Sequence, residues 1–416
     1  MTTDLKIPSH VPPELVVDYD PVIGPEVNAF PPSALDGGLR ERYRVFYTPF
    51  GVGHWVFTRY ADIRAIYEDP ELFVQEGTLP GVEGTFAASM IPLTLNPPEH
   101  RSWRKVLQPM FSPKRLRSLE DIIRQTAVER IREIGPAGRC DLPTDFAIAL
   151  PAATFCGLLG LPQSDFRSFN QLAFDMVYTP DQVRKEQGHE AAMAFRVAKS
   201  QEIVGLVSEL IERRRTEPSG DIVSFLLSAA YEDRPLTDAE ILNITHLLFF
   251  AGTDSTGAMI TYSLMFLAAH PEYKQRLLDS PEIIPQATEE LIRYHGFHNI
   301  TRDVSRDTEF AGVQLKRGDR VMLPNGSANH DSRMYPAGDT VNFDRQPRGA
   351  VTFGAGPHRC IGSPLAVLQV KVALEEFVKA LPDYAIAPDD VVKYACMTNK
   401  SIPSRVPIVY TPRTFG

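Results

Sequence analysis

The stretch Phe353-Gly-Ala-Gly-Pro-His-Arg-Cys-Ile-Gly362 places a single cysteine, Cys360, on a glycine-rich loop. The glycines allow the backbone to turn tightly and to approach a flat ligand closely. A helix is predicted from Pro364 to Ala380, because proline is well tolerated in the first helical turn. The amide dipoles at the start of that helix would favour the thiolate form of Cys360. The pattern favours a metal-bound thiolate over a buried structural cysteine beside a glycine turn.

The composition indicates a globular enzyme that binds neither nucleic acid nor membrane. The 416 residues are 43% hydrophobic and 23% charged, and a net charge of −9 argues against a nucleic-acid binder. The N-terminal residues contain no apolar run long enough for a signal peptide or a membrane anchor. The four cysteines are widely spaced without a C-x-x-C pair, so a disulfide framework or a common zinc site is not expected. We therefore expect a protein of the reducing cytoplasm.

Hydrophobic periodicity predicts an α+β protein, mostly α, with small sheets. Residues 1–36 are rich in proline and are expected to lie extended over the surface. From about Pro113 to His295 helical periodicity dominates. Further expected elements are a hairpin of Arg44–Tyr47 and His54–Thr58, a helix at Ala61–Tyr67, and a hairpin of Glu309–Val313 and Arg320–Leu323. No repeat or second module such as a flavin domain is found, so we expect a single domain over residues 1–416.

The segment Asn96-Pro-Pro-Glu-His-Arg-Ser-Trp-Arg104 predicts an anion-binding helix face. His100 and Arg104 are four residues apart, so a helix places both on one face, where they could grip an anionic group. The alternative is a solvated charged helix.

A long helix is predicted after Thr237, because Thr237 and Glu240 have the spacing of a capping box. Its apolar run Leu247–Ala251 meets an acid and an alcohol, Asp254 and Ser255. Buried polar groups must find partners, so their presence in a core helix points to function. The alternative is a hydroxyl that bonds back to a carbonyl of the preceding turn, and both interpretations can hold together.

Glu290 and Arg293 have the spacing of an ion pair on one helical face. The segment Asn342-Phe-Asp-Arg345 follows about fifty residues later and adds a further arginine.

Together these segments resemble the cytochrome P-450 family from about residue 10 to the end. The loop at residues 353–362 matches its haem-binding pattern F-x-x-G-x-[HR]-x-C-x-G, and residues 96–104 resemble its D-P-P-x-H-x-x-x-R segment. Residues 251–256 resemble its [AG]-G-x-[DE]-T-[TS] oxygen-activation motif, and the Glu290–Arg293 pair its E-x-x-R motif. In the family this pair joins an arginine before the haem loop, so the resemblance implies Arg345 as the third member of a structural network. The soluble bacterial camphor-type hydroxylases are the most similar branch.

The resemblance implies a helix-rich haem-thiolate monooxygenase with haem b as cofactor and Cys360 as the iron ligand. It implies haem-propionate contacts from His100, Arg104, Arg302 and His358. Asp254 and Ser255 would deliver protons during oxygen activation. The remaining haem contacts that it implies are Phe353, Ala251 and Gly362.

Three departures from the family pattern stand out. Ser255 replaces the usual threonine, which keeps the hydroxyl but loosens its rotamer. Ala350 stands where the family usually has a histidine that supports a propionate, so this support is either missing or provided by Arg348. Ala88 falls where the camphor enzymes carry a substrate-binding tyrosine, which makes camphor a poor candidate substrate.

A mainly apolar pocket for a compact substrate, terpenoid-like or aromatic, is expected. Each candidate could equally be plain core, and His298 and Asn299 could bond one polar group or have a structural role. The candidates are Phe86, Met90, Ile91, Phe174, Leu247, Phe250, His298, Asn299 and Ile300.

The resemblance implies hydroxylation of the substrate with O2, in a monomer that receives electrons from NAD(P)H through a ferredoxin reductase and an iron–sulfur ferredoxin. Two alternatives stay open, a peroxide-driven or redox-neutral haem-thiolate enzyme and a haem sensor without turnover. A basic cluster in this acidic chain could be the ferredoxin-docking surface, or simply a solvated face. Its members are Arg101, Arg104, Lys105, Lys114, Arg115, Arg117 and Arg359.

Overall fold

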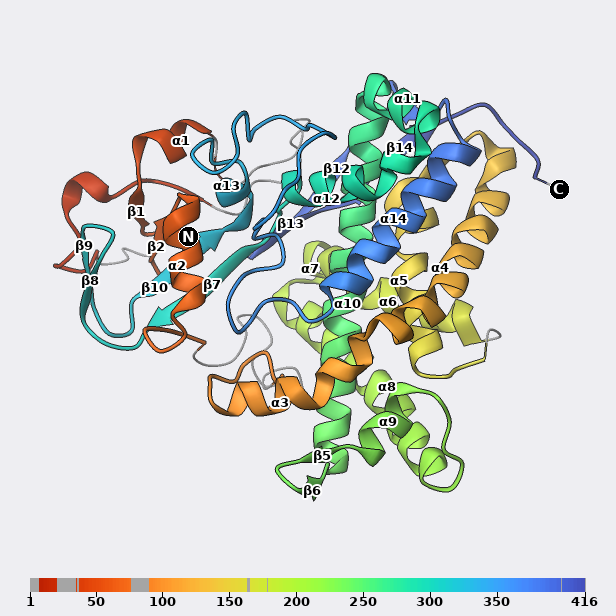
Figure 1. Cartoon of the computed structure of the whole chain (residues 1–416), viewed down its shortest axis with the longest axis horizontal. Coiled ribbons are helices and arrows are strands. Elements are labelled where there is room, and N and C mark those ends of the chain that lie inside the picture. Colours follow the sequence, from red (N-terminus) through yellow and green to blue (C-terminus); the bar gives the residue numbers. More distant parts are fainter. Residues whose placement is uncertain are drawn as a thin grey trace. The chain divides into compact units, whose positions relative to one another are not determined.

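The computed structural model describes residues 7–20, 35, 37–75, 90–162, 165–177, 179–397 and 399–415. The chain divides into two compact units. Figure 1 shows the whole chain, coloured along the sequence, with helices and strands labelled where there is room. Unit 1 comprises Met1–Glu76, Gln286–Cys360 and Cys396–Ile402, and unit 2 comprises Gly77–Pro285, Ile361–Ala395 and Pro403–Gly416. The expectation that residues 1–416 form a single domain concerns how these two units are joined, and this expectation stays a prediction.

The described part of unit 1 is built on a five-stranded sheet with the strand order β1-β2-β10-β7-β3. β1 pairs antiparallel with β2, β10 pairs parallel with β2, and β7 pairs antiparallel with both β10 and β3. The strands are β1 (Val45–Thr48), β2 (His54–Phe57), β3 (Phe73–Val74), β7 (Asn299–Val304) and β10 (Arg320–Pro324). The helices are α1 (Gly37–Arg42), α2 (Tyr60–Glu68), α12 (Ile284–Tyr294, whose first two residues belong to unit 2) and α13 (Asn325–Asn329). The first predicted hairpin and the helix after it are confirmed.

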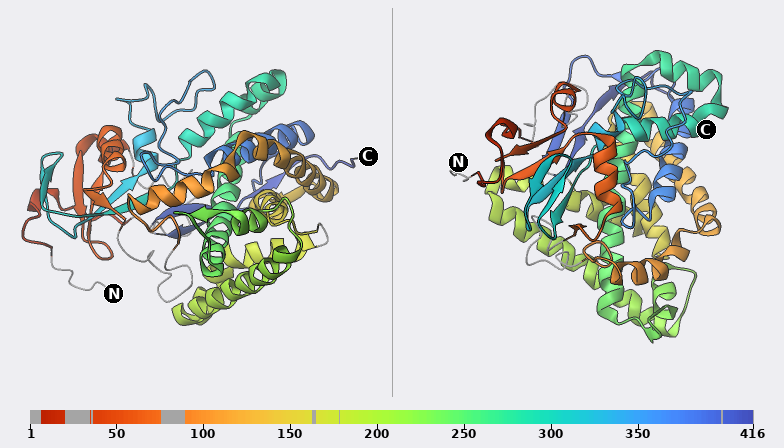
Figure 2. Two further views of the ribbon diagram at one scale, coloured as in Figure 1. Left: turned by 60° about the horizontal axis from the view of Figure 1, so that its bottom comes forward. Right: turned by 60° about the vertical axis from the view of Figure 1, so that its left-hand side comes forward.

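Both faces of this sheet are covered, which explains why its strands are apolar at successive positions. In β1 and β2, Tyr47 and Trp55 pack into one core cluster, whereas Phe46 and Val56 pack into another on the opposite face. Ile63 and Ile66 of α2 belong to the first cluster, and Figure 2 shows α2 alongside the strands. The helix is therefore fixed to the sheet by its apolar face.

The second predicted hairpin is wrong. β8 (Thr308–Phe310) pairs with β9 (Val313–Leu315), and β10 pairs instead with β7 and β2. The turn of the actual hairpin is Ala311-Gly312, with φ values of 54° and 87°. Such a two-residue turn requires positive φ at both positions, and alanine gives no sequence signal for it.

Unit 1 contains the predicted three-residue ion network, and the structure confirms that Arg345 belongs to it. Both carboxylate oxygens of Glu290 accept hydrogen bonds of 2.8 Å from Arg293, and Arg345 Nη1 donates to Glu290 at 2.7 Å. Arg293 also donates to the backbone carbonyls of Asn329 and Gly338. Glu290 and Arg293 are fully buried, so these bonds satisfy groups that water cannot reach.

Unit 2 is mostly helical, as the periodicity from Pro113 to His295 predicts. Its centre is α10 (Asp238–Ala269), which begins with the predicted capping box of Thr237 and Glu240. α10 packs against α5, α8 and α14, and α14 packs along α4. The helices are α3 (Glu99–Leu107), α4 (Pro113–Ile134), α5 (Ala149–Leu158), α6 (Phe166–Val177), α7 (Thr179–Gln187), α8 (His189–Thr216), α9 (Ile222–Ser228), α10, α11 (Pro271–Asp279) and α14 (Ser363–Ala380).

Short helical turns and strands complete the described elements. The turns are η1 (Pro13–Leu15), η3 (Gln108–Phe111), η4 (Gly135–Ala137), η5 (Pro143–Ala147) and η7 (Pro281–Ile283). β11 (Ala385–Ile386), β14 (Pro407–Val409) and β4 (Arg139–Asp141) form a sheet in unit 2, as do β5 (Ala230–Tyr231) and β6 (Arg234–Pro235). The boundary between the units falls within β12 (Lys393–Met397) and within β13 (Lys400–Arg405).

In the part of the N-terminal segment that the structure describes, η1 forms one turn and Val16 bridges Tyr47 of β1. The rest of the predicted extended segment, residues 1–6, 21–34 and 36, lies outside the described residues. Among the helices described, none combines the length and apolarity that crossing a membrane requires.

Candidate haem-thiolate site

The Cys360 loop, residues 351–360, is a tight turn held by its own backbone. The Cys360 amide donates to the Phe353 carbonyl at 2.8 Å, and the Gly354 amide donates to the Val351 carbonyl at 2.8 Å. Gly354 and Gly356 have φ values of +70° and +63°, the left-handed region that favours glycine. The hydrogen bond between Cys360 and Phe353 therefore closes the loop, and Cys360 is exposed.

Gly356 also packs against the backbone of α2. A Cβ at this position would lie 2.2 Å from the carbonyl oxygen of Tyr67, a distance that no real side chain can adopt. Both the dihedral angle and the space at residue 356 therefore require glycine.

The base of the loop is fixed by Asn329, which links it to the buried ion network. The Val351 amide donates to Asn329 Oδ1 at 2.8 Å, and Asn329 Nδ2 donates to Thr352 Oγ1 at 2.7 Å. Asn329 Nδ2 also donates to the Arg293 carbonyl at 3.0 Å, while Arg293 Nη1 donates to the Asn329 carbonyl. The position of Cys360 thus depends on buried hydrogen bonds that begin at Glu290.

The other described cysteines are poor candidates for a metal-bound thiolate. Burial raises the pKa of the Cys140 thiol to about 12 and that of Cys156 to about 11. Both thiols stay protonated near neutral pH, whereas a metal ligand must lose its proton. The side chain of Cys396 lies outside the described residues. Cys360, which is exposed and lies on a structured loop, is the better candidate.

Arg302 on β7 is a buried cation in unit 1. It donates to Gln75 Oε1 at 2.9 Å and to the Thr301 carbonyl at 2.7 Å, and it lies 5.9 Å from the Tyr67 ring centroid. Burial lowers the pKa of Arg302. No carboxylate in the described part of the chain lies within ion-pairing distance of it. A buried guanidinium in this condition suits an anionic ligand.

Two further predicted haem contacts, Phe353 and His358, belong to the Cys360 loop itself. His358 is partly buried, and Phe353 is partly buried beside Gly354. Arg348, which is the candidate to support a propionate in place of the family's histidine, has an exposed side chain.

In unit 2, α3 presents His100 and Arg104 one turn apart, as predicted. His100 is 2% exposed and shares the buried face of α3 with Trp103 and Leu107. Arg104 is partly exposed at the edge of that face. The helix thus brings a buried imidazole and a guanidinium onto adjoining positions.

The acid and the alcohol of α10 are hydrogen-bonded to each other. Ser255 Oγ donates to Asp254 Oδ1 at 3.1 Å, and Asp254 is only 6% exposed. Thr253, the neighbouring residue, instead donates to the Phe249 carbonyl at 2.8 Å. The alternative arrangement, a hydroxyl bonded to the preceding turn, is therefore the one that Thr253 adopts.

Ala251 and Gly252 are exposed in the middle of this otherwise buried helix. A Cβ added to Gly252 would meet no atom within 4 Å. Small residues leave open space beside Asp254 and Ser255, as a large flat ligand requires.

Three predicted pocket residues of unit 2 come together. Met90, Leu247 and Phe250 form an apolar cluster, and Met90 is 1% exposed. Sequence reasoning missed Asn243, whose Oδ1 accepts a 2.6 Å hydrogen bond from the Ile91 amide. Asn243, Leu247, Phe250 and Asp254 follow the i, i+4, i+7, i+11 spacing of one helix face, a signal that the sequence does contain.

The remaining pocket candidates are distributed over other elements. Phe174 is partly buried on α6 of unit 2. In unit 1, Ile300 packs against the core cluster that covers the sheet, and the buried Asn299 donates its amide to the Asn399 carbonyl. His298 is partly buried, and its backbone forms an isolated antiparallel β-bridge with that of Lys400. Phe86 and Ala88 lie outside the described residues.

Comparisons with known proteins agree on one family. The family model described as Cytochrome P450 matches residues 163–382, just over half of the chain. The mycinamicin IV hydroxylase/epoxidase of Micromonospora griseorubida is 31% identical over 370 residues, which cover 87% of this chain and 91% of that protein. The vitamin D(3) 25-hydroxylase of Pseudonocardia autotrophica is 31% identical over 368 residues, 86% of this chain and 89% of that protein.

A solved structure shows the same fold over nearly the whole chain. The crystal structure of cytochrome P450 CYP101C1 has a TM-score of 0.86 and 29% sequence identity, and covers 97% of this chain and 99% of that one. CYP109E1 from Bacillus megaterium, solved in complex with corticosterone, has a TM-score of 0.77 and 26% identity, with 86% and 92% of the two chains covered.

Gly356→Ala is expected to reduce the haem content of the purified protein to a small fraction of the wild-type value. An alanine there combines positive φ with a clash against the Tyr67 carbonyl, so the Cys360 loop cannot close. Gly51→Ala is the matched control, because Gly51 has a φ of +67° but open space around its Cβ. Both changes add about 1–2 kcal/mol of backbone strain, and only Gly356→Ala adds the clash. Equal haem content in the two variants would contradict the role assigned to the close packing of Gly356 on α2.

Proposed function

The chain belongs to the cytochrome P450 family, and we propose that it inserts one oxygen atom from O2 into a C–H bond of a small to medium apolar substrate. It is a monooxygenase with haem, iron protoporphyrin IX, as its cofactor. The observation that carries the proposal is the exposed Cys360 on a loop that two left-handed glycines and the Tyr67 carbonyl hold in shape.

The described residues of each unit suit this cofactor. In unit 1, Cys360 would ligate the iron, and Arg302 and His358 would hold carboxylates of the haem, with Phe353 in contact with it. In unit 2, His100 and Arg104 would hold a carboxylate, and Ala251 and Gly362 would lie against the haem. Support comes from the buried Arg302 without a carboxylate partner in the described chain and from the open space at Gly252.

Haem ligated by a thiolate supplies O2 activation, because the sulfur pushes electron density that favours O–O cleavage. The chain's own contribution is proton movement. For proton delivery, Ser255 Oγ would turn from Asp254 and donate its proton toward the haem, and Asp254, once protonated, would replace that proton through the hydrogen bond that the two residues share. Asp254 is only 6% exposed, so this exchange would take place largely away from bulk water.

An apolar substrate is supported by the cluster of Met90, Leu247 and Phe250, which lies on the same face of α10 as Asp254. Asn243 fixes the wall by holding the Ile91 amide. Relatives named as a mycinamicin IV hydroxylase/epoxidase and a vitamin D(3) 25-hydroxylase are consistent with hydroxylation of the substrate. A panel of terpenoids, aromatic acids and steroids, with vitamin D(3) and mycinamicin IV added, is the appropriate first screen by spectral titration.

The class of reaction is tested by Cys360→Ser. The reduced carbon-monoxide complex of the wild type should absorb near the red-shifted position that names the family, and this band should disappear in Cys360→Ser but persist in the control Cys156→Ser. Product formation should require O2, nicotinamide cofactor and a surrogate ferredoxin. Product formed with peroxide alone would favour the peroxide-driven alternative, and haem reduction without any product would favour a sensor.

Ser255→Ala is expected to divert a several-fold larger share of nicotinamide electrons into hydrogen peroxide while haem content and substrate affinity stay unchanged. The reason is the loss of the only hydroxyl that is bonded to Asp254 among the residues described. Thr253→Val is the matched control, because that hydroxyl already donates to the Phe249 carbonyl. Product and peroxide yields per electron are the measurement. Normal coupling in Ser255→Ala, or equal uncoupling in Thr253→Val, would contradict the assignment.

The electron donor is proposed to be an acidic ferredoxin that docks on a basic surface of unit 2. This surface is formed by the solvent side of α3 and the first turns of α4, and none of its members forms an ion pair with another described residue. The cations at the start of α4 lie where the helix dipole disfavours positive charge, which argues that they serve a partner. The basic surface consists of Arg101, Lys105, Lys114, Arg115 and Arg117.

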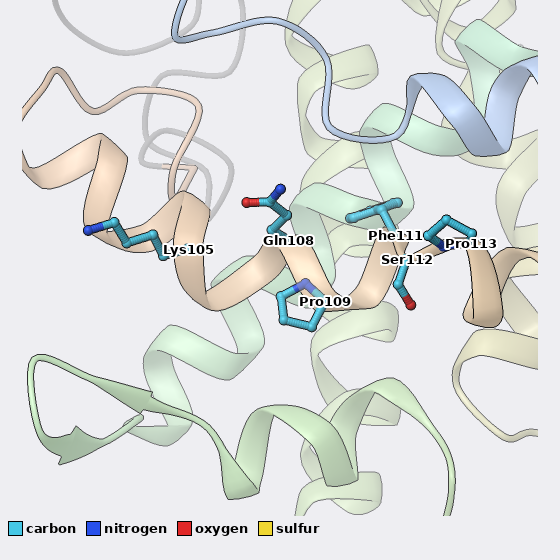
Figure 3. Close-up of a pocket in the computed structure, with 6 residues that line it drawn as sticks. All are labelled: Lys105, Gln108, Pro109, Phe111, Ser112 and Pro113. Carbon is cyan, nitrogen blue, oxygen red and sulfur yellow. The ribbon is translucent and has the colours of Figure 1, made fainter.

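A hollow of about 470 Å³ lies within this surface, at the junction of α3, η3 and α4 (Figure 3). Lys105 stands at one side, and Pro109, Phe111 and Pro113 give the hollow an apolar lining. A partner that brings carboxylates and one apolar side chain would match both properties.

Lys105→Glu and Lys114→Glu are expected to raise the Michaelis constant for an acidic ferredoxin several-fold, with substrate affinity and the carbon-monoxide spectrum unchanged. The reversed charges repel the donor and slow its association. Lys379→Glu, in the last turn of α14, is the control for the same charge change elsewhere in unit 2. Wild-type rates should also fall as salt rises from roughly 0.01 to 0.15 M, because the screening length shrinks from about 30 to about 8 Å. Electron transfer indifferent to both changes would rule out this surface.

A further inference from the structure

The buried face of α3 stacks on a hairpin that precedes α10. Trp103 is 2% exposed, and its ring lies 4.1 Å from that of Tyr231, centroid to centroid, at an interplanar angle of 20°. Such stacked aromatic pairs contribute beyond the area that they bury. Trp103 directly precedes Arg104 and lies one turn after His100.

The hairpin that carries Tyr231 is short and closes in a two-residue turn. β5 and β6 pair antiparallel with Tyr231 opposite Arg234, and the turn between them is Glu232-Asp233. Both turn residues have positive φ, 47° and 65°. A two-residue turn of this kind has a twist that matches the twist of the two strands it joins. Its position at one end of α10 can be followed in Figure 1.

Arg234 ties the hairpin to the capping box of α10. Its guanidinium lies 5.3 Å from the centroid of the Tyr231 ring and donates to both carboxylate oxygens of Glu240, at 2.6 and 2.9 Å. Glu240 also accepts from the Thr237 amide at 2.8 Å. These bonds, with Arg234 the largest influence, lower the pKa of Glu240 to about 2. A continuous series of contacts therefore runs from the start of α10 through Arg234 and Tyr231 to Trp103.

We propose that the β5–β6 hairpin positions α3, with Tyr231 and Arg234 as positioning residues that act through Trp103. The inference rests on the proposed function, in which His100 and Arg104 of α3 hold a haem carboxylate. Tyr231 restrains the rotation of α3 about its axis, because turning the helix would pull the Trp103 ring out of the stack. The start of α10 serves as the fixed point, since its capping box and the Arg234–Glu240 pair restrain the hairpin.

The test uses the purified holoprotein and two measurements, the rate of haem transfer to excess apomyoglobin and the hydrogen exchange of the amides of α3. Tyr231→Leu should raise both rates about two- to tenfold, the range that corresponds to loss of one aromatic pair. Tyr231→Phe keeps the stack and should behave as the wild type. Phe169→Leu is the matched control, because it removes a buried aromatic contact of unit 2 that does not involve α3.

Unchanged rates in Tyr231→Leu, or equal increases in Phe169→Leu, would overturn the proposal. So would a Tyr231→Phe variant that loses haem as fast as Tyr231→Leu. If Tyr231→Leu does not fold, Arg234→Gln unties the hairpin from Glu240 and should raise both rates about twofold, since the pair is partly exposed. If hydrogen exchange in α3 is faster in Tyr231→Leu but the rate of haem loss is unchanged, the positioning of α3 by the hairpin is supported. The same result would overturn the proposed role of His100 and Arg104 in holding a haem carboxylate.

Discussion

The buried pair of Glu290 and Arg293 is the interaction on which the candidate cysteine site of unit 1 depends. A fully buried ion pair contributes little by itself, but removal of one partner would leave an uncompensated charge in the core. Arg293 uses its remaining donors on backbone carbonyls, including that of Asn329. Asn329 then holds the amide of Val351 and the hydroxyl of Thr352, the residues from which the Cys360 loop departs. The pair is thus linked by hydrogen bonds to the base of the loop, where Val351 also packs into the core cluster of unit 1.

In α10, too, buried polar groups depend on hydrogen bonds, because they interrupt a helix that is apolar and buried over most of its length. A buried carboxylate is costly without hydrogen bonds, and Asp254 receives one from Ser255. Thr253 satisfies its own hydroxyl within the helix, so the two alcohols on either side of Asp254 make different hydrogen bonds. Exposed Ala251 and Gly252 lie immediately before them, which keeps the space open on the side where chemistry is proposed.

Much of this arrangement could be predicted from local sequence. The capping box at Thr237, the pairing of Glu290 with Arg293, and the first hairpin all depend on residues with strong positional preferences, whereas Arg345 was expected from the family resemblance. The second hairpin could not be predicted, because Ala311 adopts positive φ only where the flanking strands require it. The need for glycine at residue 356 is visible as a motif, but its cause is a contact with Tyr67, almost 300 residues earlier in the sequence. Asn243 and Tyr231 were missed because their roles depend on backbone and ring partners more than a hundred residues away.

α3 is a short helix with two proposed roles, one on its buried face and one on its exposed face. Its buried face contains His100, Trp103 and Leu107, whereas Arg101 and Lys105 point to solvent. Nine residues are too few for a helix to be stable alone in water, so tertiary contacts must fix it. The stack on Tyr231 provides such a contact on the buried face without using the solvent face. The exposed cations can therefore serve an external partner, while the position of the helix is set by a stack on its opposite, buried face.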